Sequence, residues 1–163
     1  MEFKTILVAN YYLNKIGGTE TFSYSMIKEL KKKGFEVEYF TFYKGIVSNK
    51  KEKGLGVSYK SKSSYDLILA NHNKCVEYLS KYGLTIQTCH GIFPELEQPS
   101  IYADGFVSIS EEVSNHLIKK GFNSKIIWNG IDCVRFNNKA PINKSLKKVL
   151  SLSHSKSANK KIH

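Results

Sequence analysis

Short apolar runs alternate with helix-like segments along most of this chain, and this alternation constrains its fold more than any other feature. Residues 4–10 (KTILVAN) form an unbroken apolar run, which is typical of a strand buried on both faces of a parallel sheet. From Thr19 onward, apolar residues recur at helical spacing until a group of lysines and Gly34 ends the segment. Residues 35–43 (FEVEYFTFY) then alternate as a second strand, which completes a β-α-β unit.

The same order resumes after residues 44–64, a segment rich in Lys, Gly and Ser that predicts a loop or irregular structure. Further strands are predicted at 66–72, 84–91, 104–110 and 124–132, and further helices at 73–83 and 110–121. Ser110 is the expected N-cap of the last helix, since a serine hydroxyl accepts a hydrogen bond from the first turn. This order predicts an α/β fold, a Rossmann-like three-layer sandwich around a mostly parallel sheet.

The net charge of +11 is concentrated in two segments. Residues 44–62 carry six lysines and one glutamate, and residues 139–163 carry seven lysines and no acid, so these segments contribute +5 and +7. Arg135 is the single arginine, whereas specific readers of nucleic acid rely on the guanidinium fork, so nucleic acid is not an expected partner. A lysine-rich loop fits a solvated surface or the anionic headgroups of a membrane.

The remaining composition favours an ordinary cytoplasmic protein. No run approaches the ~18 apolar residues of a membrane-spanning helix, and the N-terminus MEFKTILVAN does not resemble a signal peptide. Cys75, Cys89 and Cys133 are widely spaced and odd in number, which indicates neither a metal-binding pair nor a disulfide framework. We therefore expect reduced thiols, no metal, and a cytoplasmic location, with peripheral contact to the inner membrane face through residues 44–62 as a further option.

Ligands of open α/β sheets bind outside the carboxyl ends of the strands, so the residues that follow each strand are the candidates for a site. These residues are Asn10 with the Gly17-Gly18 loop, His72 with Asn73, His90 with Gly91, and Ser110. Most of them are amide, imidazole or glycine groups that can hydrogen-bond a polar ligand. The sequence thus predicts a cleft along this edge of the sheet.

The stretch NKIGGTETF at 14–22 places two glycines in front of the first helix. Gly17 and Gly18 allow a ligand to approach the backbone closely, and a helix start offers free N–H groups to an anion. The stretch lacks the third glycine of the dinucleotide fingerprint and the GK[ST] of a P-loop, so neither NAD nor ATP is supported. An ordinary loop with Thr19 as the helix cap fits the spacing at least as well.

His90, within TCHG, stands where a buried strand emerges, and an imidazole there can donate a hydrogen bond or act as a base. The alternative is a histidine satisfied by a neighbouring backbone group. His72 could point into the same cleft. Glu95 and Glu97 form a carboxylate pair near His90, or else two solvated acids of a proline-bounded loop. The sequence has no GxSxG or HExxH motif, and no cysteine with a convincing partner.

Several motifs, in order, resemble the N-terminal half of a GT-B glycosyltransferase of the retaining family 4 type. They are the GGTE loop, LKKKGFEVEYFTF, the TCHG strand end, VSISEEVSNHLIKKGF and IIWNGIDCVRF. The resemblance covers residues 4–136 and continues into the first strand of a second domain. It implies an N-terminal Rossmann-like acceptor-binding domain at 1–144, followed at 145–163 by the incomplete start of a donor-binding domain.

In that family two Rossmann-like domains face each other across a cleft, and the N-terminal domain mainly binds the acceptor. The resemblance implies that His90 is the catalytic residue at the transferred sugar, and that Gly17, Gly18 and Thr19 lie near the donor pyrophosphate. It implies acceptor-proximal positions for Asn10, Glu20, His72 and Asn73, and an interdomain turn at Asn129, Gly130, Ile131 and Asp132. Such enzymes use a nucleotide sugar, no dinucleotide cofactor and usually no metal.

The paired glutamates and the basic residues that hold the donor in this family lie in the half that follows, of which the chain carries only VLSLSHSKSANKKI. Ser153 and His154 stand where many members of the family have Gly-Arg, and Lys156 or Lys160 would correspond to the lysine that many members also carry. We therefore expect the acceptor-binding half of a hexosyltransferase that acts on a glycan or lipid-linked acceptor and is inactive without a donor-binding domain in cis or in trans. The alternative is a non-catalytic module that binds a membrane or partner chain through its Lys-rich loop. Residues after 143 are expected to be poorly ordered or borrowed as an edge strand.

Overall fold

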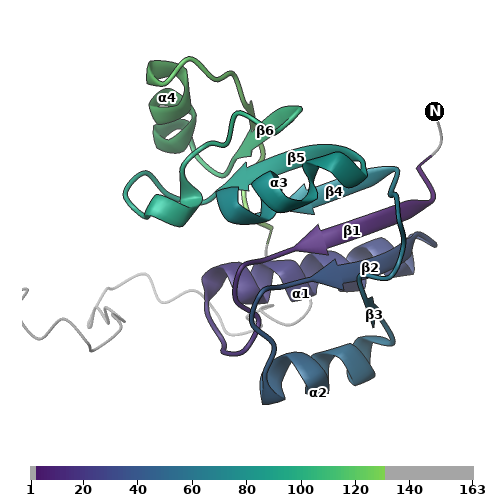
Figure 1. The fold of residues 1–163 in the computed structure, drawn as a ribbon. Helices are drawn as coiled ribbons and strands as arrows, with labels where there is room; N and C mark the ends of the chain where they lie inside the picture. Colours follow the sequence, from purple (N-terminus) through teal and green to yellow (C-terminus); the bar gives the residue numbers. More distant parts are fainter. Residues whose placement is uncertain (1–2, 131–163) are drawn as a thin grey trace, which may run out of the picture. The chain divides into compact units, whose positions relative to one another are not determined.

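The computed structural model describes residues 3–130, which form one seven-stranded parallel sheet with helices on both faces (Figure 1). The strands are β1 (Thr5–Ala9), β2 (Glu36–Phe40), β3 (Ser58–Tyr59), β4 (Leu67–Ala70), β5 (Leu84–Cys89), β6 (Gly105–Ser108) and β7 (Lys125–Ile126). The helices are α1 (Gly18–Lys32), α2 (Ile46–Leu55), α3 (Asn73–Leu79) and α4 (Glu111–Lys119), with 3₁₀ turns η1 (Ser80–Tyr82) and η2 (Glu95–Glu97). The predicted Rossmann-like α/β fold is confirmed.

The strand order β3-β2-β1-β4-β5-β6-β7 places a topological switch point between β1 and β4. The chain moves outward from β1 through β2 to β3, returns to the other side of β1 at β4, and then moves outward again. Loops that leave β1 and β4 therefore depart in opposite directions at the carboxyl edge, and this is where open α/β sheets form a ligand crevice.

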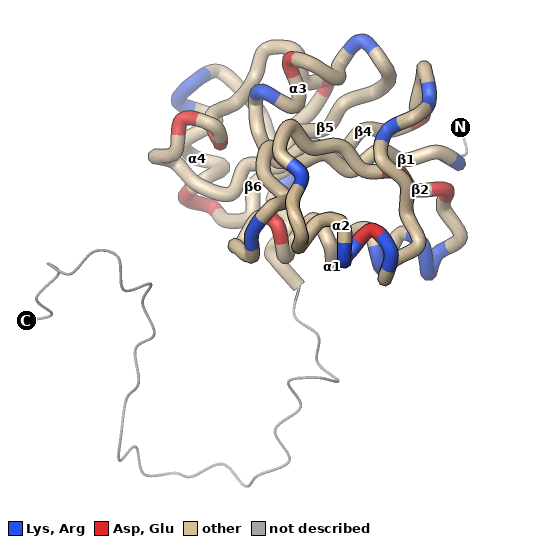
Figure 2. The backbone as a smooth tube through the Cα atoms, turned by 60° about the horizontal axis from the view of Figure 1, so that its bottom comes forward, with Lys and Arg blue, Asp and Glu red and all other residues tan. Residues whose placement is uncertain are grey.

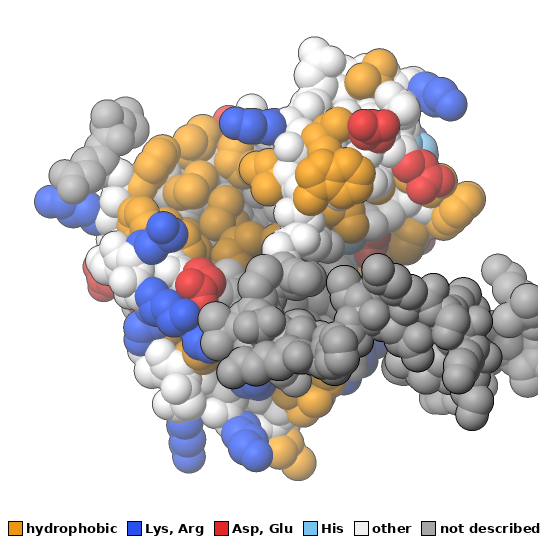
Figure 3. Space-filling model, turned by 180° about the vertical axis from the view of Figure 1, so that it is seen from behind, with side chains coloured by type: hydrophobic (Ala, Val, Ile, Leu, Met, Phe, Trp, Pro, Cys, Tyr) orange, Lys and Arg blue, Asp and Glu red, His pale blue; other side chains and the backbone are white. Residues whose placement is uncertain are grey.

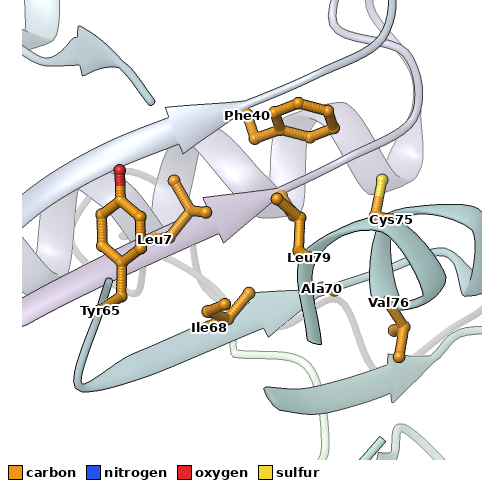
Figure 4. Close-up of a cluster of buried hydrophobic side chains, with 9 residues drawn as sticks. Leu7, Phe40, Tyr65, Ile68, Ala70, Cys75, Val76 and Leu79 are labelled. Atoms are coloured by element: carbon orange, nitrogen blue, oxygen red, sulfur yellow. The ribbon is translucent and has the colours of Figure 1, made fainter. Parts of the chain in front are cut away.

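The central strand β1 is buried on both faces, which explains its unbroken apolar sequence. Leu7 and Ala9 join a cluster with Ile68 and with Val76 and Leu79 of α3 (Figure 4). Ile6 and Val8 point to the opposite face, where they pack with Ile27 of α1 and with residues of β2. Alternating side chains of one strand thus supply both hydrophobic layers.

The helices divide between the two faces by their position along the chain. Helices α1 and α2 cover one face beside β1 and β2, whereas α3 and α4 cover the other face beside β4, β5 and β6. On the α1 side, the side chains of β4, β5 and β6 are less well covered: Leu67, Leu69, Ile86 and Val107 are only half-buried. Figure 3 views the molecule from the side opposite to that of Figure 1 and shows hydrophobic side chains gathered on this face.

The prediction of a loop or irregular structure at 44–64 is wrong, because this segment contains α2 and β3. The backbone N–H of Gly45 donates to Ser48 Oγ at 2.7 Å, and Gly56 ends α2 in the left-handed conformation at φ 57°. Tyr39 Oη lies 2.5 Å from Glu52 Oε2, and Lys31 Nζ donates to the Leu55 carbonyl at 2.7 Å. These contacts with β2 and α1 stabilise a helix whose own sequence has little amphipathic pattern.

The other predicted elements match the structure within a few residues, except that the strand predicted at 124–132 is shorter: β7 covers only Lys125–Ile126, and residues 131 and 132 lie outside the described residues. Ser110 caps α4 as expected, and its Oγ accepts from the Val113 N–H at 3.2 Å. The predicted helix 73–83 consists of α3 followed by η1. The predicted domain boundary at 144, the second-domain segment 145–163 and the edge-strand or disorder prediction after 143 lie outside the described residues.

Candidate functional site

A cavity of about 370 Å³ lies at the carboxyl edge of the sheet, between the start of α1 and the end of β5. Its lining consists of Gly18, Thr19, Phe22, His90, Glu97, Ile109 and Asn129. A larger hollow of about 570 Å³ lies at the opposite edge, around the starts of β1 and β2. In open parallel sheets, ligands bind outside the carboxyl ends of the strands, so the smaller cavity is the candidate site.

His90 is held in this cavity by a chain of amide and hydroxyl groups. Its Nε2 lies 3.1 Å from Asn71 Oδ1. The Asn71 amide nitrogen donates to Ser23 Oγ at 2.8 Å and contacts Asn10 Oδ1 at 3.3 Å. Since the amide nitrogen is used in this way, Asn71 Oδ1 is the acceptor and His90 Nε2 carries the proton. The other ring nitrogen, Nδ1, is then the unprotonated one.

Burial lowers the pKa of His90 to about 4, so the ring is neutral at pH 7. Phe22 of α1 meets the imidazole edge to face, with the ring centroids 4.8 Å apart. The contact with Phe22 and the Asn71 hydrogen bond fix the ring on two sides. The ring is thus held in one orientation, with Nδ1 as its remaining hydrogen-bond acceptor.

His72 has a different environment, although it follows the neighbouring strand. It is buried at the N-cap of α3, and its Nδ1 accepts a hydrogen bond from the Tyr11 backbone N–H at 3.1 Å. Burial, followed by the proximity of His90, lowers the pKa of His72 to about 4. It is not among the cavity-lining residues. Its hydrogen bond instead ties the loop after β1 to the start of α3.

Asn10 and Asn73, two other positions assigned to an acceptor, are also not among the cavity-lining residues. Asn10 is fully buried, donates to the Tyr12 carbonyl at 2.6 Å and meets Asn71. Asn73 opens α3 and donates to the Glu95 carbonyl at 2.8 Å. Asn10 thus supports the lining residue His90 through Asn71, and the structure does not test the acceptor contacts that the family resemblance implies.

The double glycine occupies the start of α1, with Gly17 in the N-cap position. Thr19 is a helical residue that contacts Glu20 Oε2 at 3.3 Å, so the alternative in which Thr19 caps the helix is wrong. The Glu20 carboxylate is buried against Gly17, where a Cβ would come within 2.3 Å of Oε2. The helix start therefore already faces a negative charge, which disfavours strong phosphate binding by this loop alone.

The acidic pair near His90 is divided between the cavity and the surface. Glu97 lines the cavity, and burial raises the pKa of its carboxyl group. The position of Glu97 also explains why residue 91 is a glycine, because a Cβ there would come within 2.6 Å of Glu97 Oε2. Glu95 is exposed, as a solvated acid would be. Only one member of the pair is thus placed to meet a ligand.

Sequence reasoning missed Phe22, Ile109 and Asn71 as parts of the site. Phe22 and Ile109 read as core residues of a helix and a strand end, and only the packing shows that they line the cavity. Asn71 directly follows β4, so the strand-end rule could have found it beside His72. Of the predicted interdomain turn, Asn129 lines the cavity and Gly130 is exposed, while Ile131 and Asp132 lie outside the described residues.

The described part of the chain, residues 3–130, also bears on other classes of site. This part of the chain holds no group of three or more His, Cys, Asp or Glu side chains arranged for a metal ion. Cys75 and Cys89 are free, buried thiols, and burial raises the pKa of Cys89 to about 12. None of the helices in the described region has the length and apolar character needed to cross a membrane.

Comparison of the chain with known protein families and with curated proteins identifies no relative. No protein-family model matches the chain, and no curated protein matches it. The glycosyltransferase resemblance of the motifs therefore stays a prediction.

Proposed function

We propose that this chain is the acceptor-binding half of a glycosyltransferase that uses a nucleotide sugar. The observation that carries the proposal is a cavity at the carboxyl edge of a Rossmann-like sheet that contains one fixed, neutral imidazole. Small-molecule sites combine apolar walls with a few oriented polar groups. Phe22 and Ile109 supply the apolar wall here, and His90, Thr19 and Asn129 supply polar groups.

His90 is suited to orient a sugar hydroxyl. With Nε2 directed to Asn71, Nδ1 is left to accept a hydrogen bond from a ligand hydroxyl group. A pKa of about 4 makes the ring a weak base at neutral pH, so positioning explains its placement better than proton abstraction. Glu97, on the same cavity, can accept a hydrogen bond from a second hydroxyl group.

The donor must be held mainly by another domain. The Glu20 carboxylate against Gly17 opposes a pyrophosphate at the start of α1, and none of the residues between 3 and 130 that line the cavity is a lysine or arginine. Stabilising a departing nucleoside diphosphate needs positive charge or several aligned donors. We therefore propose that the chain binds an acceptor weakly and becomes an active transferase only with a donor-binding domain in cis or in trans.

Ligand titrations monitored by NMR test this proposal on the full 163-residue chain. The probes are alkyl glycosides as acceptor mimics, and UDP-glucose, UDP-N-acetylglucosamine and GDP-mannose as donors. We expect weak, saturable shifts from a glycoside at the amides of Thr19, Gly91 and Ile109, and weaker effects from every donor. His90→Ala should abolish these shifts.

His116→Ala is the matched control, because His116 is a half-buried imidazole on α4 that contacts Gln98 Oε1 and does not line the cavity. It should leave the glycoside shifts unchanged. Tight, specific binding of a nucleotide sugar by this chain alone would contradict the proposal. So would a lack of any glycoside effect at the cavity.

A further inference from the structure

We propose that the loops at the carboxyl ends of β1 and β2, together with α2, bind an anionic lipid surface. This surface, the aromatic edge, consists of Tyr12, Ile16, Phe42, Tyr43 and Ile46, flanked by Lys15, Lys44 and Lys50. It differs from the cavity described above in both residues and chemistry. The inference does not depend on the proposed sugar-transferase activity.

The two loops are joined into one surface by their backbones and rings. Tyr12 and Tyr43 form an isolated parallel bridge, and their rings stack with centroids 5.2 Å apart. The Tyr11 ring lies 5.1 Å from Phe42 and extends the same aromatic group. Phe42 and Tyr43 are 41% and 48% exposed, so part of each ring faces the surface.

Two isoleucines project from adjacent points of these loops. A Cβ on Gly45 would lie 2.9 Å from Asn14 Cβ, so the two backbones abut there. Ile16 follows Asn14 by two residues and is 76% exposed, and Ile46 follows Gly45 directly and is 87% exposed. Aliphatic side chains at the tips of neighbouring loops can enter the boundary between headgroups and acyl chains without any change in the fold.

Lysines flank these apolar groups and match an anionic surface. Lys15 lies 5.0 Å above the Tyr12 ring, and Lys44 lies 3.9 Å above the Tyr59 ring. Helix α2 carries Lys50, Lys51 and Lys53 on its exposed side, and Figure 2 shows lysines along this helix. Its acid, Glu52, is engaged with Tyr39 and Lys44. Each lysine near anionic headgroups strengthens attachment, and tyrosine rings favour the interface.

The combination favours lipid over nucleic acid. Single-stranded nucleic acids stack on flat, accessible rings, whereas the Tyr12 and Tyr43 rings stack on each other. The most exposed residues at the loop tips are aliphatic, and these have no role in binding a phosphodiester backbone. A lipid bilayer uses all three features of the edge: aliphatic tips, tyrosine rings and lysines.

Vesicle sedimentation of the full chain tests the inference. Phosphatidylcholine vesicles are compared with vesicles in which about a third of the lipid is phosphatidylglycerol, at physiological salt. We expect binding to the anionic vesicles alone. Ile16→Ser combined with Ile46→Ser should weaken that binding about tenfold or more, because two exposed side chains no longer enter the bilayer. Both positions are exposed, so the double variant should keep the thermal stability of the native chain.

The control replaces Ile101 and Ile118, which are 76% and 55% exposed elsewhere, with serine. A second comparison uses two double variants that each remove two lysines. Lys15→Gln with Lys50→Gln removes them from the aromatic edge, and Lys119→Gln with Lys120→Gln removes them from the C-terminal end of α4. Only the edge variants should lose binding. If the edge and control lysine variants lost vesicle binding equally, net charge alone would explain the binding, and the inference would be overturned. The inference would also be overturned if the chain bound a single-stranded oligonucleotide, if this binding required Tyr43, and if anionic vesicles did not compete with it.

Discussion

The hydrogen bond between His90 and Asn71 shows how one buried amide can decide the chemistry of a site. Asn71 uses its amide nitrogen for Ser23 and Asn10, which leaves its oxygen to accept from His90. The tautomer of His90 is therefore set from behind the cavity, and the nitrogen available to a ligand is an acceptor. Replacing Asn71 would change what His90 can bind without removing the imidazole.

The depressed pKa values of His72 and His90 predict a loss of stability in mild acid. Both histidines have a pKa of about 4 when folded, against the ordinary value of 6.5, so the unfolded chain binds more protons between these values. The free energy of unfolding should therefore fall as pH decreases from about 7 to about 5, by roughly 1–2 kcal/mol per histidine. Urea unfolding at several pH values measures this slope.

His90→Gln should remove one histidine's share of that slope while keeping a donor to Asn71. The raised pKa of Glu97 acts in the opposite direction, since a protonated carboxyl group is favoured in the folded state as pH falls. This opposing effect grows only as the pH approaches the carboxyl range, so the histidine slope is clearest near pH 6. An unfolding free energy that does not change between pH 7 and pH 5 would contradict the assigned histidine environments.

At the scale of elements, Gly83 allows two backbone segments to approach closely at the start of a strand. It connects η1 to β5, and a Cβ there would come within 2.1 Å of the Tyr65 carbonyl oxygen. A backbone oxygen cannot move away as a flexible side chain can, so Gly83→Ala should destabilise the protein by about 2–3 kcal/mol. Chemical denaturation of the variant and the native chain gives the comparison.

Gly54→Ala is the matched substitution and should have the opposite sign. Gly54 lies inside α2, and a Cβ there meets no atom within 4 Å. Because alanine favours a helix over glycine, the free energy of unfolding should rise by about 0.5–1 kcal/mol. A destabilising effect of Gly54→Ala would argue against the helix at Ile46–Leu55.

Helix α2 also shows where sequence reasoning stops. The strands β1 and β4 could be predicted because their sequences are unbroken apolar runs, and α4 because Ser110 and Gly121 bound it. In α2 the stabilising contacts come from Tyr39 and Lys31, which lie in other elements. His90 could also be predicted from the sequence, because ligands of parallel sheets bind at the residues that follow each strand. The role of Asn71 in orienting His90 could not be predicted, because it depends on side-chain directions that a sequence does not reveal.

At the scale of the whole molecule, the two faces of the sheet are covered to different extents. Parallel sheets are normally buried on both faces, because right-handed crossovers place helices there. Here the link from β3 to β4 is a short loop, and α1 and α2 stay beside β1 and β2. The main strand contacts of α1 are with β1 and β2, and not with β5 and β6 on the α1 side of the sheet. The aliphatic side chains there are consequently half-buried rather than buried.

Two isoleucines on neighbouring strands make this difference measurable. Ile68 of β4 is fully buried on the α3 side, whereas Ile86 of β5 points to the α1 side and is half-buried. Ile68→Ala should lower the free energy of unfolding by about 2–5 kcal/mol, because it leaves a cavity in a packed cluster. Ile86→Ala should cost less than about half as much, since water already reaches part of that side chain. Equal costs in urea unfolding would mean that the α1 side of β5 is as well covered in solution as the α3 side of β4.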